Sequence, residues 1–315
     1  MYEELLKLDE VEIHFSAEGM HVVNFILAFV MFGVALGIKP QMFKNVFLYP
    51  KSVILGLFCQ WIALPAVTFF LVVVFNRYIT PMVAMGMLLV AACPGGNMSN
   101  FMSHLSKGNT ELSISLTAIT TAFSTIVTPF NFALWGGFYV KFINKHAENA
   151  LQTLHIDTFQ MFETVFLLLG IPIVLGFLVV RFLPKVAEKV KKPMQYLSIV
   201  FFMVMIAVAF SNNLDVFLRH IFYIFILVFI HNFLALSTGF GIATIFNVPA
   251  IDRRSLAIET GIQNSGLGLV LLFNPKIFPP EMAMGGMLLV TAWWGIWHII
   301  SGLSVSLYWS RHPVK

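Results

Sequence analysis

Apolar segments of about 20 residues recur along the whole chain, and short loops that hold most of the charges separate them. A helix of that length is what crosses the hydrocarbon core of a bilayer. Hydrophobic residues make up 58% of the sequence and charged residues only 11%, far below the roughly 25% usual in soluble domains. The chain is therefore predicted to be an all-α polytopic membrane protein, forming one transmembrane unit over residues 1–315.

About nine transmembrane helices are expected from the spacing of these segments. Loops on one side of the expected membrane hold thirteen of the nineteen Lys and Arg residues, and loops on the other side hold six. Basic residues accumulate in cytoplasmic loops, so the N-terminus is expected outside and the C-terminus in the cytoplasm. This loop pattern favours a lipid bilayer over nucleic acid as the partner of the positive charge. The spans are expected near 20–38, 52–75, 81–105, 110–139, 158–180, 194–212, 220–246, 255–273 and 281–309.

Two of these spans contain polar interruptions. The third span holds a proline and two glycines near residues 93–100, and the eighth holds glycines beside polar side chains near residues 259–266. Proline lacks an N–H, so the third helix is expected to break at about mid-depth. Broken spans at comparable places in two halves point to a secondary transporter with inverted repeats. We expect an incomplete first repeat over residues 1–139 and a second repeat over 158–309.

Glu259 is the most informative single residue, because it lies deep in the eighth span. A carboxylate there costs several kcal/mol unless a cation, a proton or a basic group brought in by the fold compensates it. Thr260, Gln263 and Asn264 supply neutral oxygen nearby, and oxygen is what hard cations prefer. The alternative is a protonated glutamic acid that is hydrogen-bonded between helices.

Other polar residues in apolar spans carry weaker signals. Ser113 and Thr117 are four residues apart and share a helix face, although such hydroxyls often bond only to backbone. Gln60 is an amide in an apolar setting that needs a partner. His298 follows Trp297 in the last span, where a lone histidine is usually structural. Cys59 and Cys93 both lie in apolar segments, so no disulfide framework is expected.

The order and spacing of these residues resemble the bile acid:sodium symporter family, including its bacterial members. The resemblance covers nearly the whole chain. Its most specific parts are Cys93-Pro94-Gly95-Gly96 with Ser99-Asn100, then Lys107-Gly108-Asn109 with Ser113 and Thr117, Glu259 with Gln263-Asn264-Ser265-Gly266, and Trp297-His298 with Ser301-Gly302.

The resemblance implies a panel domain and a core domain in which two discontinuous helices cross near mid-membrane. It also implies two sodium sites. The first would use Ser99, Asn100, Ser113, Thr117 and Glu259, and the second would use Gln60, Glu259, Gln263 and the backbone carbonyls of Thr260 and Ile262. The substrate would lie between the domains near Asn97, Asn264 and His298, where helix N-termini attract an anion.

Two departures from the family pattern stand out. Bacterial relatives often have an additional helix before the stretch 20–38, and this chain is expected to lack it, which is why the first repeat is expected to be incomplete. The threonine often found after the double glycine is Asn97, and bulky Trp293 and Trp294 precede the Trp-His pair. These departures leave the substrate open and allow a molecule smaller than a bile acid.

The chain is thus expected to be a sodium-coupled symporter of a small organic anion, working by alternating access in the bacterial inner membrane, functional as a monomer. Sodium ions are the only cofactor expected. The alternatives are a proton-coupled or arsenite-type exporter in which the Cys93 thiolate acts as a soft ligand, and a membrane-embedded enzyme. The sequence contains none of the hydrolase or metal-site motifs that an enzyme of that kind would need, so an enzyme is not expected.

Overall fold

A computed structural model describes residues 1–9, 25, 28–29, 31–33, 35–37, 50–146, 166, 170–211, 214–274, 277–278 and 282–312. The regular elements named within these ranges are helices, which confirms the all-α prediction. They are α1 (Tyr2–Asp9), α4 (Pro50–Phe58), the π-helical turn η2 (Cys59–Ala63), α5 (Leu64–Val74), α6 (Pro81–Ala92), α7 (Met98–Leu105), α8 (Thr110–His146), α10 (Ile171–Phe182), α11 (Pro184–Ser211), α12 (Leu214–Ile245), α13 (Ala250–Gly261), α14 (Ser265–Leu272) and α15 (Gly285–Arg311).

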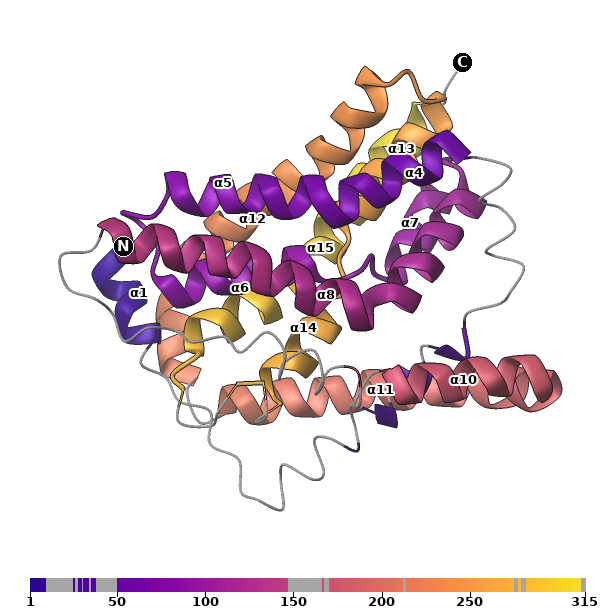
Figure 1. Cartoon of the computed structure of the whole chain (residues 1–315), viewed down its shortest axis with the longest axis horizontal. Helices are drawn as coiled ribbons and strands as arrows, with labels where there is room; N and C mark the ends of the chain where they lie inside the picture. The colour runs from indigo at the N-terminus through magenta and orange to yellow at the C-terminus, as the bar shows by residue number, and fades with distance from the viewer. Residues whose placement is uncertain are drawn as a thin grey trace.

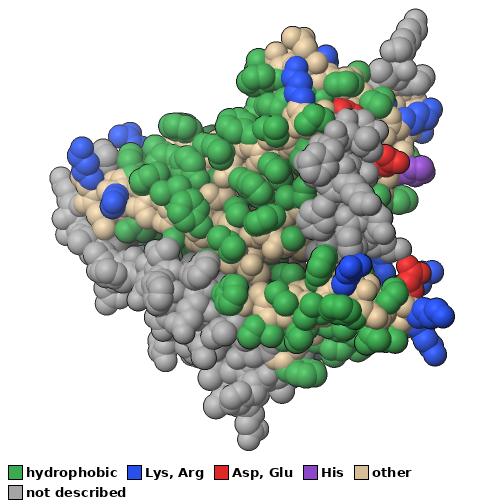
Figure 2. Space-filling model, turned by 45° about the vertical axis from the view of Figure 1, so that its right-hand side comes forward, with side chains coloured by type: hydrophobic (Ala, Val, Ile, Leu, Met, Phe, Trp, Pro, Cys, Tyr) green, Lys and Arg blue, Asp and Glu red, His purple; other side chains and the backbone are tan. Residues whose placement is uncertain are grey.

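Four stretches of described helix are long and apolar enough to cross a bilayer, namely Pro50–Val74, Thr110–Lys145, Leu218–Ile245 and Gly285–Arg311. Among the residues drawn in colour in Figure 2, hydrophobic side chains are prominent on this face and most Lys and Arg side chains lie toward the edges. Such a surface suits lipid. Much of the expected spans 20–38 and 158–180 lies outside the described residues, so the number of spans stays a prediction.

Helices α10 and α11 form a layer beside the remaining bundle (Figure 1). The described residues between 25 and 37 pack on this layer, because the ring centroids of Phe29 and Phe201 are 5.8 Å apart. A Cβ added to Gly176 of α10 would also contact Ala35. The layer meets the bundle where α11 contacts α12. This arrangement agrees with the panel and core implied by the family resemblance, whereas the two repeats, 1–139 and 158–309, stay a prediction.

The interruptions predicted in the third and eighth spans are both present. Helix α6 is separated from α7 by residues 93–97, and α13 is separated from α14 by residues 262–264. The two interruptions meet in an isolated antiparallel bridge between Gly95 and Gln263. Segments about 170 residues apart in the chain therefore cross inside the bundle, as in discontinuous-helix transporters.

Backbone hydrogen bonds hold the crossing together. The N–H of Gly96 donates to the carbonyl of Ile262 at 2.7 Å, and the N–H of Asn264 donates to the carbonyl of Pro94 at 2.8 Å. Backbone groups that lose their helical partners are tolerated at membrane depth only when protein or water satisfies them. Each interruption thus supplies hydrogen-bonding partners that the other lacks.

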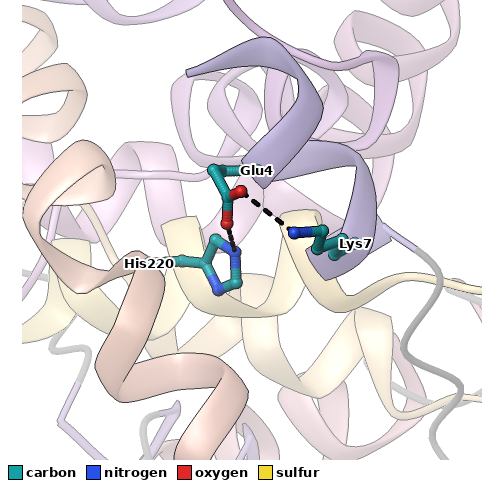
Figure 3. A network of polar contacts seen from close by, with 3 residues as sticks. All are labelled: Glu4, Lys7 and His220. Atoms are coloured by element: carbon teal, nitrogen blue, oxygen red, sulfur yellow. Dashed lines mark hydrogen bonds and ion pairs between the residues drawn. The ribbon is translucent and has the colours of Figure 1, made fainter.

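Helix α1 docks on one end of the bundle, against α6, α12 and α15. Leu5 and Leu8 are fully buried by this contact. On its surface, the Glu4 carboxylate lies 3.0 Å from the ammonium of Lys7 and 3.6 Å from Nε2 of His220 on α12 (Figure 3). Because Glu4 and Lys7 are largely exposed, this network contributes little to stability, and burial of the leucines is the main cause of docking.

Asp9, the last residue of α1, joins the first turns of two membrane helices. Its carboxylate accepts hydrogen bonds from the hydroxyl of Thr80 at 2.9 Å and from the N–H of Met82 at 3.1 Å, at the start of α6. A Cβ on Gly286, at the start of α15, would collide with the same carboxylate. Acidic groups are stabilising near helix N-termini, so Asp9 is placed to hold the α6 and α15 ends together.

Stability should fall as pH rises because of Asp9. Burial raises the pKa of this carboxyl from 3.8 to about 7, so the folded state binds more protons than the unfolded state between those values. Raising the pH from 4 to 8 should then remove stability on the order of 1–4 kcal/mol. We expect the thermal unfolding midpoint of purified protein in detergent to fall over this range. Asp9→Asn should flatten the slope, whereas Glu3→Gln, on the exposed face of α1, should not. Equal slopes for Asp9→Asn and the unmodified chain would contradict this role.

Candidate cation and anion site

The carboxylate of Glu259 lies at the centre of a cluster of hydroxyl groups beside the crossing. The hydroxyls of Ser99 and Ser113 donate to Oε2 at 2.5 and 2.9 Å, and the hydroxyl of Thr117 donates to Oε1 at 2.7 Å. Ser99 comes from α7, Glu259 from α13, and the other two from α8. The sequence prediction that Ser113 and Thr117 share a helix face is confirmed, and that face points at Glu259.

Asn100 forms a second layer of the same cluster. Its Oδ1 lies 3.0 Å from the hydroxyl of Ser113 and 3.1 Å from that of Thr117, so each of these hydroxyls has both Glu259 and Asn100 as acceptors for its single proton. The five residues expected in the first sodium site therefore lie together. Three helices supply them, so the cluster exists only when the broken halves α7 and α13 are both seated against α8.

The amides of Gln60 and Gln263 lie on the other side of Glu259. The Gln60 Nε2 donates to the backbone carbonyl of Glu259 at 2.5 Å, and its Oε1 accepts from Gln263 Nε2 at 3.0 Å. Gln263 Nε2 also donates to the carbonyl of Thr260 at 2.7 Å. The Oε1 of Gln263 is buried and has no hydrogen-bond partner among the described residues. An orphaned buried acceptor of this kind is costly and invites a cation or a donor.

The backbone carbonyls of residues 259–262, at the end of α13, each accept a hydrogen bond. A helix leaves its last carbonyls without helical partners. Here those of residues 259 and 260 accept from the two glutamine amides, and that of Gly261 accepts from Asn232 Nδ2 of α12 at 2.7 Å. That of Ile262 accepts from the N–H of Gly96. The carbonyls of Thr260 and Ile262, expected as free sodium ligands, therefore each accept a hydrogen bond in this structure.

The buried carboxylate of Glu259 needs a positive charge nearby to be stable. Glu259 is only 1% exposed. The ion pairs of the described residues do not include it, so hydroxyl donors alone face this carboxylate. No group of three His, Cys, Asp or Glu side chains in the described ranges could hold a metal ion. A cation here would rely on carboxylate, hydroxyl and amide oxygen, which is the chemistry that hard ions prefer.

The three residues expected to bind substrate lie around the crossing but differ in exposure. Asn97 is exposed and directly precedes α7 without a side-chain capping hydrogen bond, whereas Asn264 is half-buried and caps the start of α14 by accepting from the N–H of Leu267 at 3.1 Å. His298 is buried on α15. Its face of α15 covers the crossing, because Cβ atoms on Gly295 and Gly302 would contact Ser265 and Ile262. The Nδ1 of His298 has no partner in the described part of the chain.

A second group of buried polar contacts, around Asp252 and Arg254 near the start of α13, was not predicted from the sequence. The expected span began at residue 255, but α13 begins at Ala250, so Arg254 lies in the helix rather than in a loop. Its guanidinium donates to the carbonyls of Ser106 at 2.6 Å and Trp309 at 3.0 Å, near the ends of α7 and α15. The carboxylate of Asp252 accepts from Ser52 and Asn109 at 2.6 and 2.8 Å.

Two interrupted helices that cross over a buried, oxygen-rich cluster are the architecture of a secondary transporter. The chain belongs to the Sodium Bile acid symporter family, whose sequence model matches residues 24–220. This membership confirms the family recognised from sequence and the expectation that the protein is a membrane transporter and not an enzyme. It also makes a small molecule the cargo and sodium the co-transported ion of the family.

Named relatives agree with this placement. The chain is 30% identical over 296 residues to the "Uncharacterized sodium-dependent transporter YocS" of Bacillus subtilis, covering 93% of this chain and 84% of that protein. It is 24% identical over 277 residues to the "Probable sodium/metabolite cotransporter BASS2, chloroplastic" of Oryza sativa subsp. japonica, covering 85% and 62%. It is 28% identical over 265 residues to the human "Sodium/bile acid cotransporter 4", covering 84% and 58%. The chain thus spans less than two thirds of the latter two relatives.

Proposed function

We propose that this protein couples the inward movement of Na⁺ to the uptake of a small organic anion, by alternating access between the core and the α10–α11 layer. The observation that carries the proposal is the Glu259 carboxylate, buried without a described cationic partner and surrounded by neutral oxygen atoms. A buried anion of this kind is stable only when a cation or a proton compensates it. The neutral oxygen atoms around this carboxylate are ligands that a hard metal cation prefers.

One Na⁺ would bind at the hydroxyl cluster of Ser99, Asn100, Ser113, Thr117 and Glu259. A second would bind beside Gln60 and Gln263, with the carbonyls of Thr260 and Ile262. At that second position the Gln263 amide donates to the carbonyl of Thr260, the backbone N–H of Gly96 donates to that of Ile262, and the Gln60 amide donates to that of Glu259. Binding would require the glutamine oxygens to turn toward the ion, and the unpartnered Oε1 of Gln263 is the first ligand available for it.

The anion would bind where α7 and α14 begin, near Asn97 and Asn264, with His298 as a further donor. Helix N-termini carry partial positive charge and attract anions. These two N-termini belong to the same interrupted helices that form the cation cluster. Seating the helices by Na⁺ would therefore complete the anion site, and this gives the two ligands the differential affinity that coupling requires.

A carboxylate such as a pantoate-like or bile-acid-like molecule is the class of substrate that two helix N-termini and a histidine would accept.

The positive-inside rule favours an N-terminus outside and a C-terminus in the cytoplasm. A relative from Bacillus subtilis supports a bacterial plasma membrane. We propose that the monomer is the functional unit, since the whole cluster comes from one chain.

Proteoliposomes test the coupling directly. Uptake of radiolabelled pantoate and taurocholate should be measured with an inward Na⁺ gradient, with equal Na⁺ on both sides, and with K⁺ replacing Na⁺. The proposal expects uptake of at least one probe to exceed the K⁺ level several-fold only under the Na⁺ gradient. In parallel, Na⁺ but not K⁺ should raise the unfolding midpoint of the purified protein, because a ligand stabilises the state that it binds. Identical behaviour in Na⁺ and K⁺ in both assays would remove sodium coupling.

A further inference from the structure

The turn that carries Gln60 is an irregular one. Residues 59–63 form a π-helical turn between α4 and α5, and the N–H of Leu64 donates to the carbonyl of Cys59, five residues back. Such π-turns are rare and occur often at functional sites. Here the turn precedes Pro65, which has no N–H to donate. In a regular helix, the N–H of residue 65 would satisfy the carbonyl of Trp61, so that carbonyl loses its ordinary partner.

Asn131 of α8 replaces the missing donor. Its Nδ2 donates to the carbonyl of Trp61 at 2.9 Å. Asn131 is only 4% exposed. The ring of Trp61 also packs edge-on against Phe123 of α8, with the centroids 6.0 Å apart. The π-turn is therefore fixed to α8 at two points, a hydrogen bond on its backbone and an aromatic contact on its side chain.

Gln60 directly precedes Trp61, and in the orientation that this turn gives it, its amide contacts both Glu259 and Gln263. Helical turns of different period point the same residue in different directions, because each residue advances by about 100° in an α-helix and by less in a π-helix. A change in the turn would rotate Gln60 away from the cluster. The helix that fixes the turn through Asn131 also carries Ser113 and Thr117, so α8 holds both halves of the cation cluster.

We propose that Asn131 is a positioning residue for the second cation position: its amide holds the π-turn that aims Gln60 at Glu259 and Gln263. This inference rests on the proposed sodium coupling and assigns a role to a residue that contacts no ion. A purely structural asparagine, by contrast, would stabilise the fold without affecting the ion.

The test is a Na⁺ titration of the purified full chain, at constant ionic strength with K⁺, read as the shift of the unfolding midpoint. The variants are Asn131→Leu, which removes the donor, and Asn131→Ala, which leaves room for a water on the Trp61 carbonyl and so protects folding. Loss of an outer partner of a metal ligand typically weakens metal binding roughly 10- to 100-fold. We expect either variant to raise the half-saturating Na⁺ concentration about tenfold. Ser124→Ala, which removes a buried hydroxyl of α8 that donates to the carbonyl of Thr121 in the same helix, should leave that concentration unchanged.

A second pair of variants asks whether Asn131 acts through Gln60. In a Gln60→Ala background, Asn131→Ala should not raise the half-saturating Na⁺ concentration further, because the aimed side chain is already gone. An equal rise in both backgrounds would overturn the inference, and so would variants that lower the midpoint alike in Na⁺ and K⁺ without changing the half-saturating concentration. Absence of any Na⁺-specific shift in the unmodified chain would instead overturn the proposed function itself.

Discussion

Replacing Glu259 with glutamine is expected to abolish the stabilisation of the protein by Na⁺ and any Na⁺-driven uptake. Glutamine keeps the shape and an oxygen acceptor but removes the charge that a cation would balance. Breaking a buried ion pair costs about 3–5 kcal/mol, which corresponds to a loss of at least 100-fold in affinity. The measurement is the unfolding midpoint in matched Na⁺ and K⁺ buffers, together with uptake in proteoliposomes.

Glu259→Gln should also leave the stability in K⁺ unchanged or raise it, which a mutation that merely damages the fold would not do. Without Na⁺, the unmodified chain must either keep an unpaired carboxylate buried or hold a proton on it, and either state costs stability relative to a neutral amide. Glu259→Gln should therefore match or exceed the unmodified chain in stability in K⁺ while losing the Na⁺ shift. Glu111→Gln makes the same change at an exposed position in the first turn of α8 and should keep the Na⁺ shift. A Glu259→Gln variant that still responds to Na⁺ at the original concentration would show that the ion binds elsewhere.

The features that sequence analysis predicted correctly depend on short-range chemistry or on the high cost of burying charge. Pro94 followed directly by two glycines strongly disfavours a continuous helix, so the interruption could be placed to within a few residues. The position of Glu259 in an apolar span marked it as needing a partner. The shared face of Ser113 and Thr117 follows from helical periodicity, and the structure adds where that face points.

The features that sequence analysis missed depend on partners far apart in the chain. The hydrogen bond from Asn131 to Trp61 joins residues 70 positions apart, and nothing near either residue indicates the other. Arg254 has the appearance of a loop charge in the sequence, because its partners are backbone carbonyls at the ends of two other helices. Backbone acceptors leave no residue-type signal, so the sequence cannot reveal such contacts. Asp9 escaped notice because its partners, the hydroxyl of Thr80 and the backbone N–H of Met82, lie far along the chain at the start of α6.

Gly95→Ala is expected to eliminate the Na⁺-dependent shift of the unfolding midpoint, as loss of the Glu259 charge does, although it adds only one methyl group. A Cβ at this position would collide with Oε1 of Glu259 and lie 3.2 Å from Nε2 of Gln60, at the junction of the two proposed cation positions. Its φ is not in the left-handed region, so the substitution causes no backbone strain and the effect is that of the methyl group alone. Overpacking of this kind costs about 1–3 kcal/mol. We expect Gly95→Ala to lower the unfolding midpoint and to eliminate the Na⁺ shift, because the methyl group occupies the space beside the carboxylate.

Matched glycines elsewhere separate this local effect from a general intolerance of alanine. A Cβ on Gly137 of α8 or Gly241 of α12 would meet nothing within 4 Å. Alanine in a helix is favoured over glycine by roughly 0.5–1 kcal/mol, so Gly137→Ala and Gly241→Ala should preserve or slightly raise the unfolding midpoint and keep the Na⁺ shift. The decisive comparison is the Na⁺ shift rather than the midpoint itself. A Gly95→Ala variant that loses stability equally in Na⁺ and K⁺ but binds Na⁺ at the original concentration would place the ion away from the Gly95–Gln263 crossing, because a methyl group beside Glu259 and a cation on the same carboxylate compete for one space.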